Sequence, residues 1–265
     1  MTEKDLELLK NLFSDFTRSF YSSDEEDQKN IMLKVVHTHN VCSNMIEITS
    51  DLLISDNDKR LAETVALFHD IGRFPQYAKF KTFKDAASIN HGLLGAKTLI
   101  KEKVLQDLSE EERELITRTV KFHNALRIPS TFDERSVFFL KLIRDADKLD
   151  IYRVFMEFYE APEEQKASAT AHGKPDTPEY SKDMLKNIRD RKIAPYSKVK
   201  NQNDFRLMKL SWVFDLHFHG SFRLLHERSY VNRLAQKLPQ TDEILKAVSE
   251  LNRYISERLQ DVCAK

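Results

Sequence analysis

The sequence predicts an all-α protein. Only 5 of its 265 residues are glycine and 7 are proline, so it contains few of the residues that form turns and interrupt helices. Apolar side chains recur every three or four positions over long segments, as they do on the buried face of a helix. Serine or acidic caps begin several of these segments, and glycine or proline follows others, as expected at helix boundaries.

The first three expected helices lie within the N-terminal 70 residues. The first covers Glu3–Tyr21, where leucine and phenylalanine form one apolar stripe. The acidic segment "SSDEEDQKN" then supplies an N-cap and the first turn of a second helix, which continues to about Ile54. The third runs from about Lys59 to Asp70, and Gly72 and Pro75 are expected to end it.

The central part of the chain is expected to hold three more helical segments. Residues 75–88 are rich in lysine and aromatic side chains and are expected to form a loop, after which a helix begins near His91. Ser109 and the three glutamates after it are typical of a capped helix start. The segment 133–160 predicts a long helix that a row of charges interrupts.

The remaining sequence suggests how the chain is organised. Residues 161–204 are polar and carry four of the prolines, so we expect an irregular insertion or lid with one short helix. Residues 205–265 are expected to be helical and to pack on a core formed by residues 1–160. The length allows such a core within a single structural domain.

Charge and cysteine content exclude several classes of function. The 42 basic residues balance the 42 acidic ones, so we expect no binding of duplex nucleic acid or of an anionic membrane surface. Cys42 and Cys263 lie far apart and form no zinc-finger spacing. We find neither a signal peptide nor a run of about 20 apolar residues. These features predict a soluble, cytoplasmic protein.

A group of histidines and aspartates carries the functional signal. His69 and Asp70 follow the apolar run "VALF", where two buried polar side chains are costly unless they bind something. Further candidates lie near helix ends or within apolar stripes: His37, His39, His91, His123 and Asp147. Any one of them alone is an ordinary core or cap residue. Together, imidazole and carboxylate ligands without a thiolate suit Fe, Mn, Zn, Ni or Co and not a closed structural zinc site.

The order of these residues resembles the signature of a known family. His37, then His69-Asp70, then Asp147 is similar to the H…HD…D pattern of the HD-domain superfamily of metal-dependent phosphohydrolases. The contexts "HTHNV", "LFHDIGR" and "RDADKLD" are also similar, and the resemblance covers about residues 30–160. It implies an HD-domain helical bundle with additional C-terminal helices. It favours His37 as the first ligand, with His39 as the alternative.

The two further histidines extend the resemblance to HD proteins that bind two metals. In that interpretation His37, His69, Asp70 and Asp147 hold one ion, and Asp70, His91 and His123 hold a second. The resemblance therefore implies one or two divalent ions, drawn from Fe, Mn, Ni, Co, Zn or Mg, and a water that attacks a phosphate ester. The substrate is expected to be a small phosphorylated metabolite or a nucleotide, and a homodimer is compatible with the sequence.

Departures from the family pattern leave alternatives open. The GYP motif of HD-GYP phosphodiesterases is absent, and Asn124 follows His123 where those enzymes have another histidine. The same H…HD…H…H…D order occurs in di-iron HD oxygenases. A non-catalytic HD module that binds a ligand is the third alternative.

Several charged residues are candidates for roles around the metals. Arg73, Lys148 and Arg127 could pair with phosphate oxygens, so we expect Asp70, Arg73 and Lys148 to act in catalysis. Asp150 could orient a ligand histidine or cap its own turn. In "WVFDLHFHGSF", Asp215 and His219 are expected to share a helical face with His217 opposite, either as a further ligand or substrate contact or as an ordinary packed helix.

Overall fold

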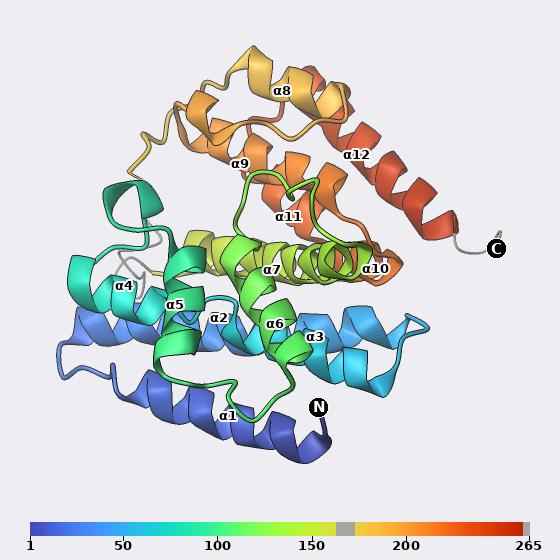
Figure 1. Cartoon of the computed structure of the whole chain (residues 1–265). Coiled ribbons are helices and arrows are strands. Elements are labelled where there is room, and N and C mark those ends of the chain that lie inside the picture. Colours follow the sequence, from blue (N-terminus) through green and yellow to red (C-terminus); the bar gives the residue numbers. More distant parts are fainter. Residues whose placement is uncertain (163–172, 262–265) are drawn as a thin grey trace. The chain divides into compact units, whose positions relative to one another are not determined.

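The computed structural model describes residues 1–162 and 173–261, and within these residues the chain is helical and has no strand. The all-α prediction is therefore confirmed. The chain divides into two compact units, with the boundary between Asp150 and Ile151. None of the described helices combines the length and the apolar character that a membrane span requires. Figure 1 shows the helices and their labels.

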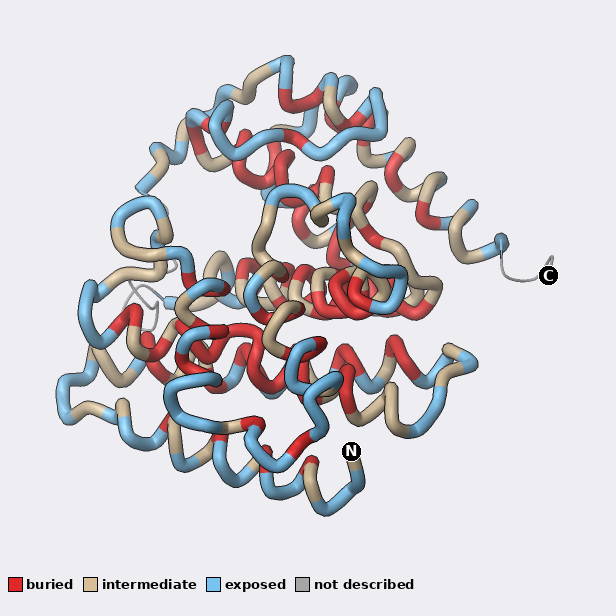
Figure 2. Tube along the Cα trace, viewed as in Figure 1, coloured by how far each residue is buried: buried red, intermediate tan, exposed pale blue. Residues whose placement is uncertain are grey.

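The first unit contains the helices that matter for the candidate site. In chain order they are α1 (Glu3–Arg18), α2 (Glu25–Ser50), α3 (Asp56–Phe68), α4 (Arg73–Phe80), the 3-10 turn η1 (Asp85–Ala87), α5 (His91–Lys101), α6 (Glu110–Phe122) and the start of α7 (Glu134–Glu160). Helix α3 packs against α1, α2 and α6, and α5 packs against α4 and α6. Helix α3 is therefore central to this unit, and its last five residues, 64–68, are all buried (Figure 2).

Side-chain caps begin most of these helices, as the sequence patterns indicate. Thr2 and Asp5 form a reciprocal capping box on α1, and Ser109 and Glu112 form another on α6. Asp24 accepts a hydrogen bond from the backbone N–H of Asp27 at the start of α2. Each cap satisfies a backbone N–H that has no partner within its own helix. The capped start predicted at Ser109 is confirmed.

The prediction of a loop over residues 75–88 is wrong in its first part. Gly72 is the N-cap of α4, and Pro75 lies in the first turn of that helix. Proline is tolerated there because the first-turn N–H groups have no acceptor within the helix. Gly72 and Pro75 therefore mark the start of a helix and not only the end of α3. The row of charges at residues 144–150 also leaves α7 continuous.

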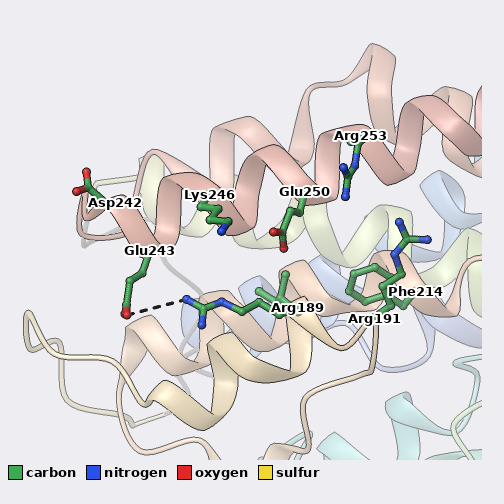
Figure 3. Close-up of a pocket in the computed structure, with 9 residues that line it drawn as sticks. Arg189, Arg191, Phe214, Asp242, Glu243, Lys246, Glu250 and Arg253 are labelled. Carbon is green, nitrogen blue, oxygen red and sulfur yellow. Dashed lines mark ion pairs between the residues drawn. The ribbon is translucent and has the colours of Figure 1, made fainter.

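The second unit consists of shorter helices and the long C-terminal helix. They are α8 (Lys182–Arg189), the 3-10 turns η4 (Tyr196–Lys198) and η5 (Trp212–Asp215), α9 (Gln202–Ser211), α10 (His219–Glu227), α11 (Tyr230–Ala235) and α12 (Asp242–Gln260). A cavity of about 490 Å³ lies between α8 and α12 and is lined mostly by charged side chains (Figure 3). Part of the predicted insertion, residues 163–172, lies outside the described residues. The packing of the C-terminal helices on the core stays a prediction.

The expected helix through Asp215 and His219 is broken. Asp215 ends η5, Leu216 and Phe218 have extended backbone angles, and His219 begins α10. Asp215 and His219 therefore do not share a helical face, and the prediction that they do is wrong. A spacing of four residues places side chains together only while the helix continues between them.

Candidate metal centre

Four histidines from four helices meet in the first unit. His37 lies within α2, His69 is the C-cap of α3, His91 begins α5, and His123 is the C-cap of α6. The Nε2 atoms of His37 and His69 are 3.3 Å apart, and those of His91 and His123 are 3.0 Å apart. All four side chains are buried. The four imidazoles therefore form two pairs, each with its Nε2 atoms directed at a common point.

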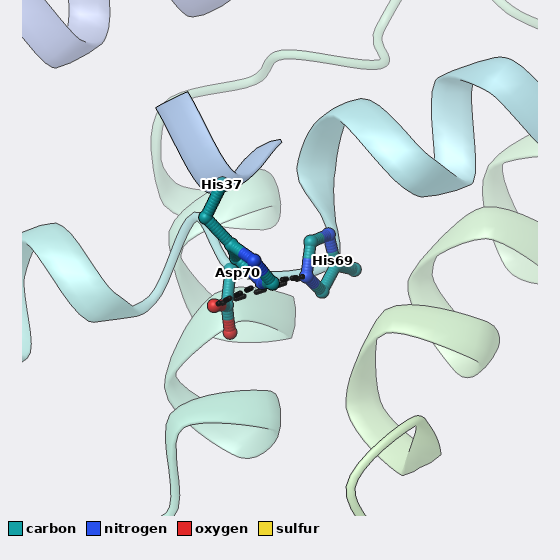
Figure 4. A group of neighbouring side chains, drawn as sticks. All are labelled: His37, His69 and Asp70. Carbon is teal, nitrogen blue, oxygen red and sulfur yellow. Dashed lines mark hydrogen bonds and ion pairs between the residues drawn. The ribbon is translucent and has the colours of Figure 1, made fainter. Parts of the chain in front are cut away.

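Asp70 stands between the two histidine pairs, and each of its oxygens faces one of them. Its Oδ2 lies 3.5 Å from Nε2 of His37 and 3.8 Å from Nε2 of His69 (Figure 4). Its Oδ1 lies 3.4 Å from Nε2 of His91 and 3.8 Å from Nε2 of His123. The candidate ligands thus form two groups that share Asp70, namely His37–His69–Asp70 and Asp70–His91–His123. A carboxylate in this position can bridge two ions.

Asp147 on α7 completes the group around His37. Its Oδ1 lies 3.1 Å from Nε2 of His37 and 3.8 Å from Nε2 of His69. Helix α7 is held beside α2 in this region by a hydrogen bond from the Asn44 amide to the backbone carbonyl of Ala146. The structure therefore brings together all six residues predicted as ligands: His37, His69, Asp70, His91, His123 and Asp147.

The outer nitrogen of each imidazole has an oxygen partner. Nδ1 of His69 lies 2.7 Å from the carbonyl of Ala66, and Nδ1 of His123 lies 2.8 Å from that of Val120. Carbonyl oxygens only accept, so these two Nδ1 atoms are the N–H donors. In a neutral imidazole the Nε2 atom then carries the lone pair that a metal needs.

Carboxylates play the same part for the other two histidines. Nδ1 of His37 lies 2.6 Å from Oδ2 of Asp150, and Nδ1 of His91 lies 2.7 Å from Oδ2 of Asp85. Of the two roles suggested for Asp150, contact with a ligand histidine is the one observed. Carboxylate–histidine pairs of this kind orient metal ligands and raise their basicity.

The electrostatics of the site favour a neutral imidazole at His69, His91 and His123 and an ionised carboxylate at Asp70. Burial lowers the pKa of His69, and it lowers the pKa of His91 and of His123 to about 4. Burial opposes ionisation of Asp70, but Lys34 and nearby groups outweigh it and hold its pKa well below the usual range. These are the protonation states in which such side chains bind metals.

His37 and Asp147 behave as a hydrogen-bonded pair. Burial and the Lys34 ammonium lower the pKa of His37, but hydrogen bonds with Asp147 and Asp150 outweigh both and raise it. Burial raises the pKa of Asp147, but the contact with His37 outweighs burial and lowers it. A metal ion would replace the proton that these groups share. Donor type, burial and convergence all fit one or two divalent ions held by nitrogen and oxygen.

A glycine allows the loop after Asp70 to approach α5 closely. A Cβ atom on Gly72 would lie 2.3 Å from the carbonyl oxygen of His91 and 2.5 Å from the backbone nitrogen of Gly95. No side chain fits there, because both neighbours are backbone atoms. The glycine therefore allows Asp70 and His91, which lie on different segments, to reach the same site.

The three residues predicted to contact phosphate differ in how close they lie to the candidate site and in how far they are buried. Arg73 lies beside the site, with its Nε 3.4 Å from Oδ1 of Asp70. Lys148 is buried on α7 next to Asp147, whereas Arg127 is exposed. Roles for Lys148 and Arg127 stay predictions. His39, the alternative first ligand, is exposed and packs edge-on against Phe13, so it is not part of the histidine group.

Two residues at the site were missed by the sequence analysis. Lys34 donates a hydrogen bond to Oδ2 of Asp70 over 2.7 Å. Its position three residues before His37 on one helix was a usable signal, since such residues share a face. Asp85 receives hydrogen bonds from Arg73, Gln76 and Asn124 as well as from His91. Asp85 lies in a turn after a loop, where no periodic pattern could indicate it.

Comparison with known proteins agrees with this geometry. The model of the HD domain family matches residues 35–152, a range that contains all six candidate ligands. No curated protein and no solved structure matches the chain. The matched range begins two residues before His37 and ends two residues after Asp150, the partner of that histidine. Over residues 35–152, somewhat less than half of its length, this chain is similar to the HD domain family.

Proposed function

We propose that this protein is a metal-dependent phosphohydrolase that hydrolyses a phosphate ester of a small metabolite or a nucleotide. The observation that carries the proposal is the position of Asp70, whose two oxygens each face one histidine pair. The HD domain supports it, because metal-dependent phosphohydrolases make up most of that family.

The candidate ligands divide naturally between two ions. His37, His69, Asp70 and Asp147 would hold one, and Asp70, His91 and His123 would hold the other. Bound divalent ions would lower the pKa of a water molecule and balance the negative charge of a phosphate group. The chain contributes the orientation of the ligands, because every imidazole has its Nδ1 atom bound to an oxygen.

Two cations beside Asp70 support a phosphorylated substrate. The guanidinium of Arg73 is held by hydrogen bonds from Nη1 to Gln76, to the carbonyl of Phe83 and to Asp85. Its Nε is buried and lies 3.4 Å from Oδ1 of Asp70, but it makes no hydrogen bond in the described part of the chain. A buried N–H without an acceptor is costly, and a phosphate oxygen could supply that acceptor.

Lys34 places a second positive charge on the other side of Asp70. Lys34 and Arg73 both lie over the ring of Phe83, with centroid distances of 5.3 and 5.8 Å, so the two cations flank one aromatic side chain. We infer that the two would bind oxygens of the same phosphoryl group. Whether the substrate is a monoester or a diester stays open in this proposal.

Metal analysis combined with a substrate screen tests the proposal. The purified protein is expected to contain up to two divalent ions per chain. With Mn²⁺, Ni²⁺, Co²⁺ or Mg²⁺ added, it should release phosphate from a panel of monoesters or cleave diesters. His69→Ala should lose the ion of its own group, and activity with it. The matched control is His39→Ala, which removes an exposed histidine from the same domain and should change neither.

Three outcomes would contradict the proposal. One is full metal content and activity in His69→Ala. Another is a protein that holds two irons with an oxo-bridge absorption band and hydrolyses none of the esters, which would favour the di-iron oxygenase alternative. A protein that binds a nucleotide but turns over no substrate would favour the non-catalytic module.

A further inference from the structure

An amphipathic groove lies in the first unit, outside the metal centre. It has a volume of about 630 Å³, within the range of cavities that hold small organic ligands. Its walls come from the C-terminal end of α5, from α6, and from the segments that follow each helix. Its lining includes Leu99, Ile100, Lys103, Arg113, Lys121 and Phe132.

The floor of the groove is apolar. Leu99 and Leu105 are buried there, and the rings of Phe122 and Phe132 meet edge to face with centroids 5.0 Å apart. Ile100 borders the same groove and is 68% exposed. The groove therefore offers a continuous apolar surface that an organic ligand could cover.

The rim of the groove is basic. Arg113, Arg118, Lys103 and Lys121 line it, against a single acidic residue, Glu114. Arg118 is paired with Asp133 at 3.0 Å and with Glu114 at 3.9 Å. Among the described residues, no carboxylate forms an ion pair with Lys103, Arg113 or Lys121. Three positive charges at the rim are therefore available to an anion.

Lys103 occupies a backbone position that normally selects glycine. Its φ is 51°, in the left-handed region. The backbone N–H of Val104 bonds to the carbonyl of Leu99, and that of Lys103 bonds to Ile100, which is the Schellman arrangement at a helix end. Glycine is favoured at this position because it has no Cβ. The chain carries a lysine here, and that lysine lines the groove.

The cavity of the second unit shows a different charge pattern. It combines Arg189, Arg191, Lys246 and Arg253 with the acidic residues Asp242, Glu243 and Glu250. Arg189 lies 4.0 Å from Glu243, and Arg191 lies 3.3 Å from Glu257. Figure 3 marks the first of these ion pairs with a dashed line. Its charges are largely balanced by its own walls. The groove beside α5 and α6 is therefore the better candidate for binding an anion.

We propose that the groove between α5 and α6 binds a small amphipathic anion, an organic acid with an apolar body. The apolar part would cover Ile100, Phe122 and Phe132, and the acid group would pair with Lys103 and Lys121. This site is additional to the proposed phosphohydrolase centre, because none of the groove residues is a candidate metal ligand. The proposal can therefore hold or fail independently of the catalytic one.

A fluorescent probe of this chemistry tests the proposal on the full chain. 1-Anilinonaphthalene-8-sulfonate has two aromatic bodies and one sulfonate, whereas N-phenyl-1-naphthylamine has the same body without the charge. The sulfonate is expected to bind saturably and at least tenfold more tightly than its uncharged analogue. Inorganic phosphate, which lacks an apolar body, should not displace it at millimolar concentration.

Variants of the groove locate the binding. Lys103→Gly and Lys121→Gln should each weaken binding of the sulfonate severalfold, and Ile100→Ser should weaken binding of both probes. The melting temperature of Lys103→Gly should be unchanged or higher, because glycine suits the left-handed position. Lys97→Gln and Ile46→Ser are matched controls, since both residues are exposed and neither lines the groove; they should leave binding unchanged.

Several results would overturn the proposal. Equal affinity for the two probes would mean that the charge is not recognised. Displacement by inorganic phosphate would place the probe at a general anion site. Unchanged binding in both Lys103→Gly and Ile100→Ser would place it away from this groove, and absence of saturable binding would mean that the groove does not take this class of ligand.

Discussion

Asp85 accepts a hydrogen bond from Nδ1 of His91 over a distance of 2.7 Å, and this contact links a surface turn to the buried candidate metal centre. The opposite nitrogen of the same ring, Nε2, lies 3.0 Å from Nε2 of His123. Arg73 and Gln76 also donate hydrogen bonds to Asp85 and fix its carboxylate. Burial raises the pKa of Asp85, but its contacts with His91 and Arg73 outweigh burial and lower it. An ionised Asp85 can only accept, so Nδ1 of His91 carries the proton.

Asp85→Asn is expected to weaken metal binding at the pair formed by His91 and His123. An amide can donate its own proton to Nδ1 and so favour the wrong tautomer of His91. Loss of such a partner typically lowers metal affinity by about 10- to 100-fold. Titration with Mn²⁺ in competition with a chelator measures the change. Asp107→Asn, at an exposed position, is the control, and equal affinity in the two variants would show that Asp85 does not position His91.

Lys34→Gln is expected to tighten metal binding. It is also expected to slow hydrolysis of the phosphate ester, because a cation proposed to bind the phosphoryl group is lost. The ammonium lies 2.7 Å from Oδ2 of Asp70, the oxygen that faces His37 and His69, so it opposes a cation at the same place. Two unit charges about 4 Å apart interact by about 4 kcal/mol near a protein surface. Because the lysine can move aside, we expect a gain of about tenfold in affinity. Chelator competition measures it. Weaker metal binding than in the control Lys59→Gln, which changes a half-buried lysine outside the candidate site, would contradict this role.

The residues that meet in the candidate metal centre could be predicted from the sequence, but their supporting contacts could not. His69 and His123 each follow an apolar helical run, so their burial at a helix end was readable. The position of Asp70 between the two histidine pairs depends on how four helices pack. The spacing of residues along the chain does not encode that packing. Asp85 illustrates the limit, because it lies in a short turn and acts only through residues 6 to 39 positions away.

The prediction of helix boundaries was wrong where one local sequence signal is compatible with two structures. Glycine followed by proline three residues later indicates either a helix end or the first turn of the next helix. At Gly72 and Pro75 the second meaning holds, because α4 follows α3 with only a short connection. Tertiary packing decides between them. Backbone atoms of α5 occupy the space that a Cβ atom on Gly72 would need. The sequence alone does not reveal this contact.

Gly72→Ala is expected to destabilise the protein strongly. The new Cβ would lie 2.3 Å and 2.5 Å from backbone atoms of His91 and Gly95, so α5 would have to move. Overpacking of this kind costs about 3 kcal/mol. Gly173→Ala is the control, since a Cβ there meets nothing within 4 Å and only its positive φ of 62° opposes the change. Urea unfolding should show a loss of about 1 kcal/mol for the control, and an equal loss in both variants would contradict the close packing at Gly72.

The Cys42 thiol is expected to be unreactive at neutral and mildly alkaline pH. Burial, with a smaller contribution from Glu63, raises its pKa to about 12. Since only the thiolate reacts, a raised pKa leaves almost no reactive form at pH 8. In a Cys263→Ser background, alkylation by iodoacetamide should be at least about 100-fold slower in the native protein than in urea. Similar rates in both states would show that the thiol is accessible and ionises normally.

Asp70→Ala and His123→Ala should separate a bridging carboxylate from a ligand of one ion. Each oxygen of Asp70 faces a different histidine pair, so its removal weakens both groups. His123 belongs to one group only, so His123→Ala should retain the ion held by His37, His69 and Asp147. Metal content after equilibrium dialysis against Mn²⁺ should be near zero in the first variant and near one ion per chain in the second, with circular dichroism confirming the fold of both. A contrary result would be one tightly held ion in Asp70→Ala and none in His123→Ala. Asp70 would then not bridge two ions, because its loss would affect fewer ions than the loss of His123, which faces only one.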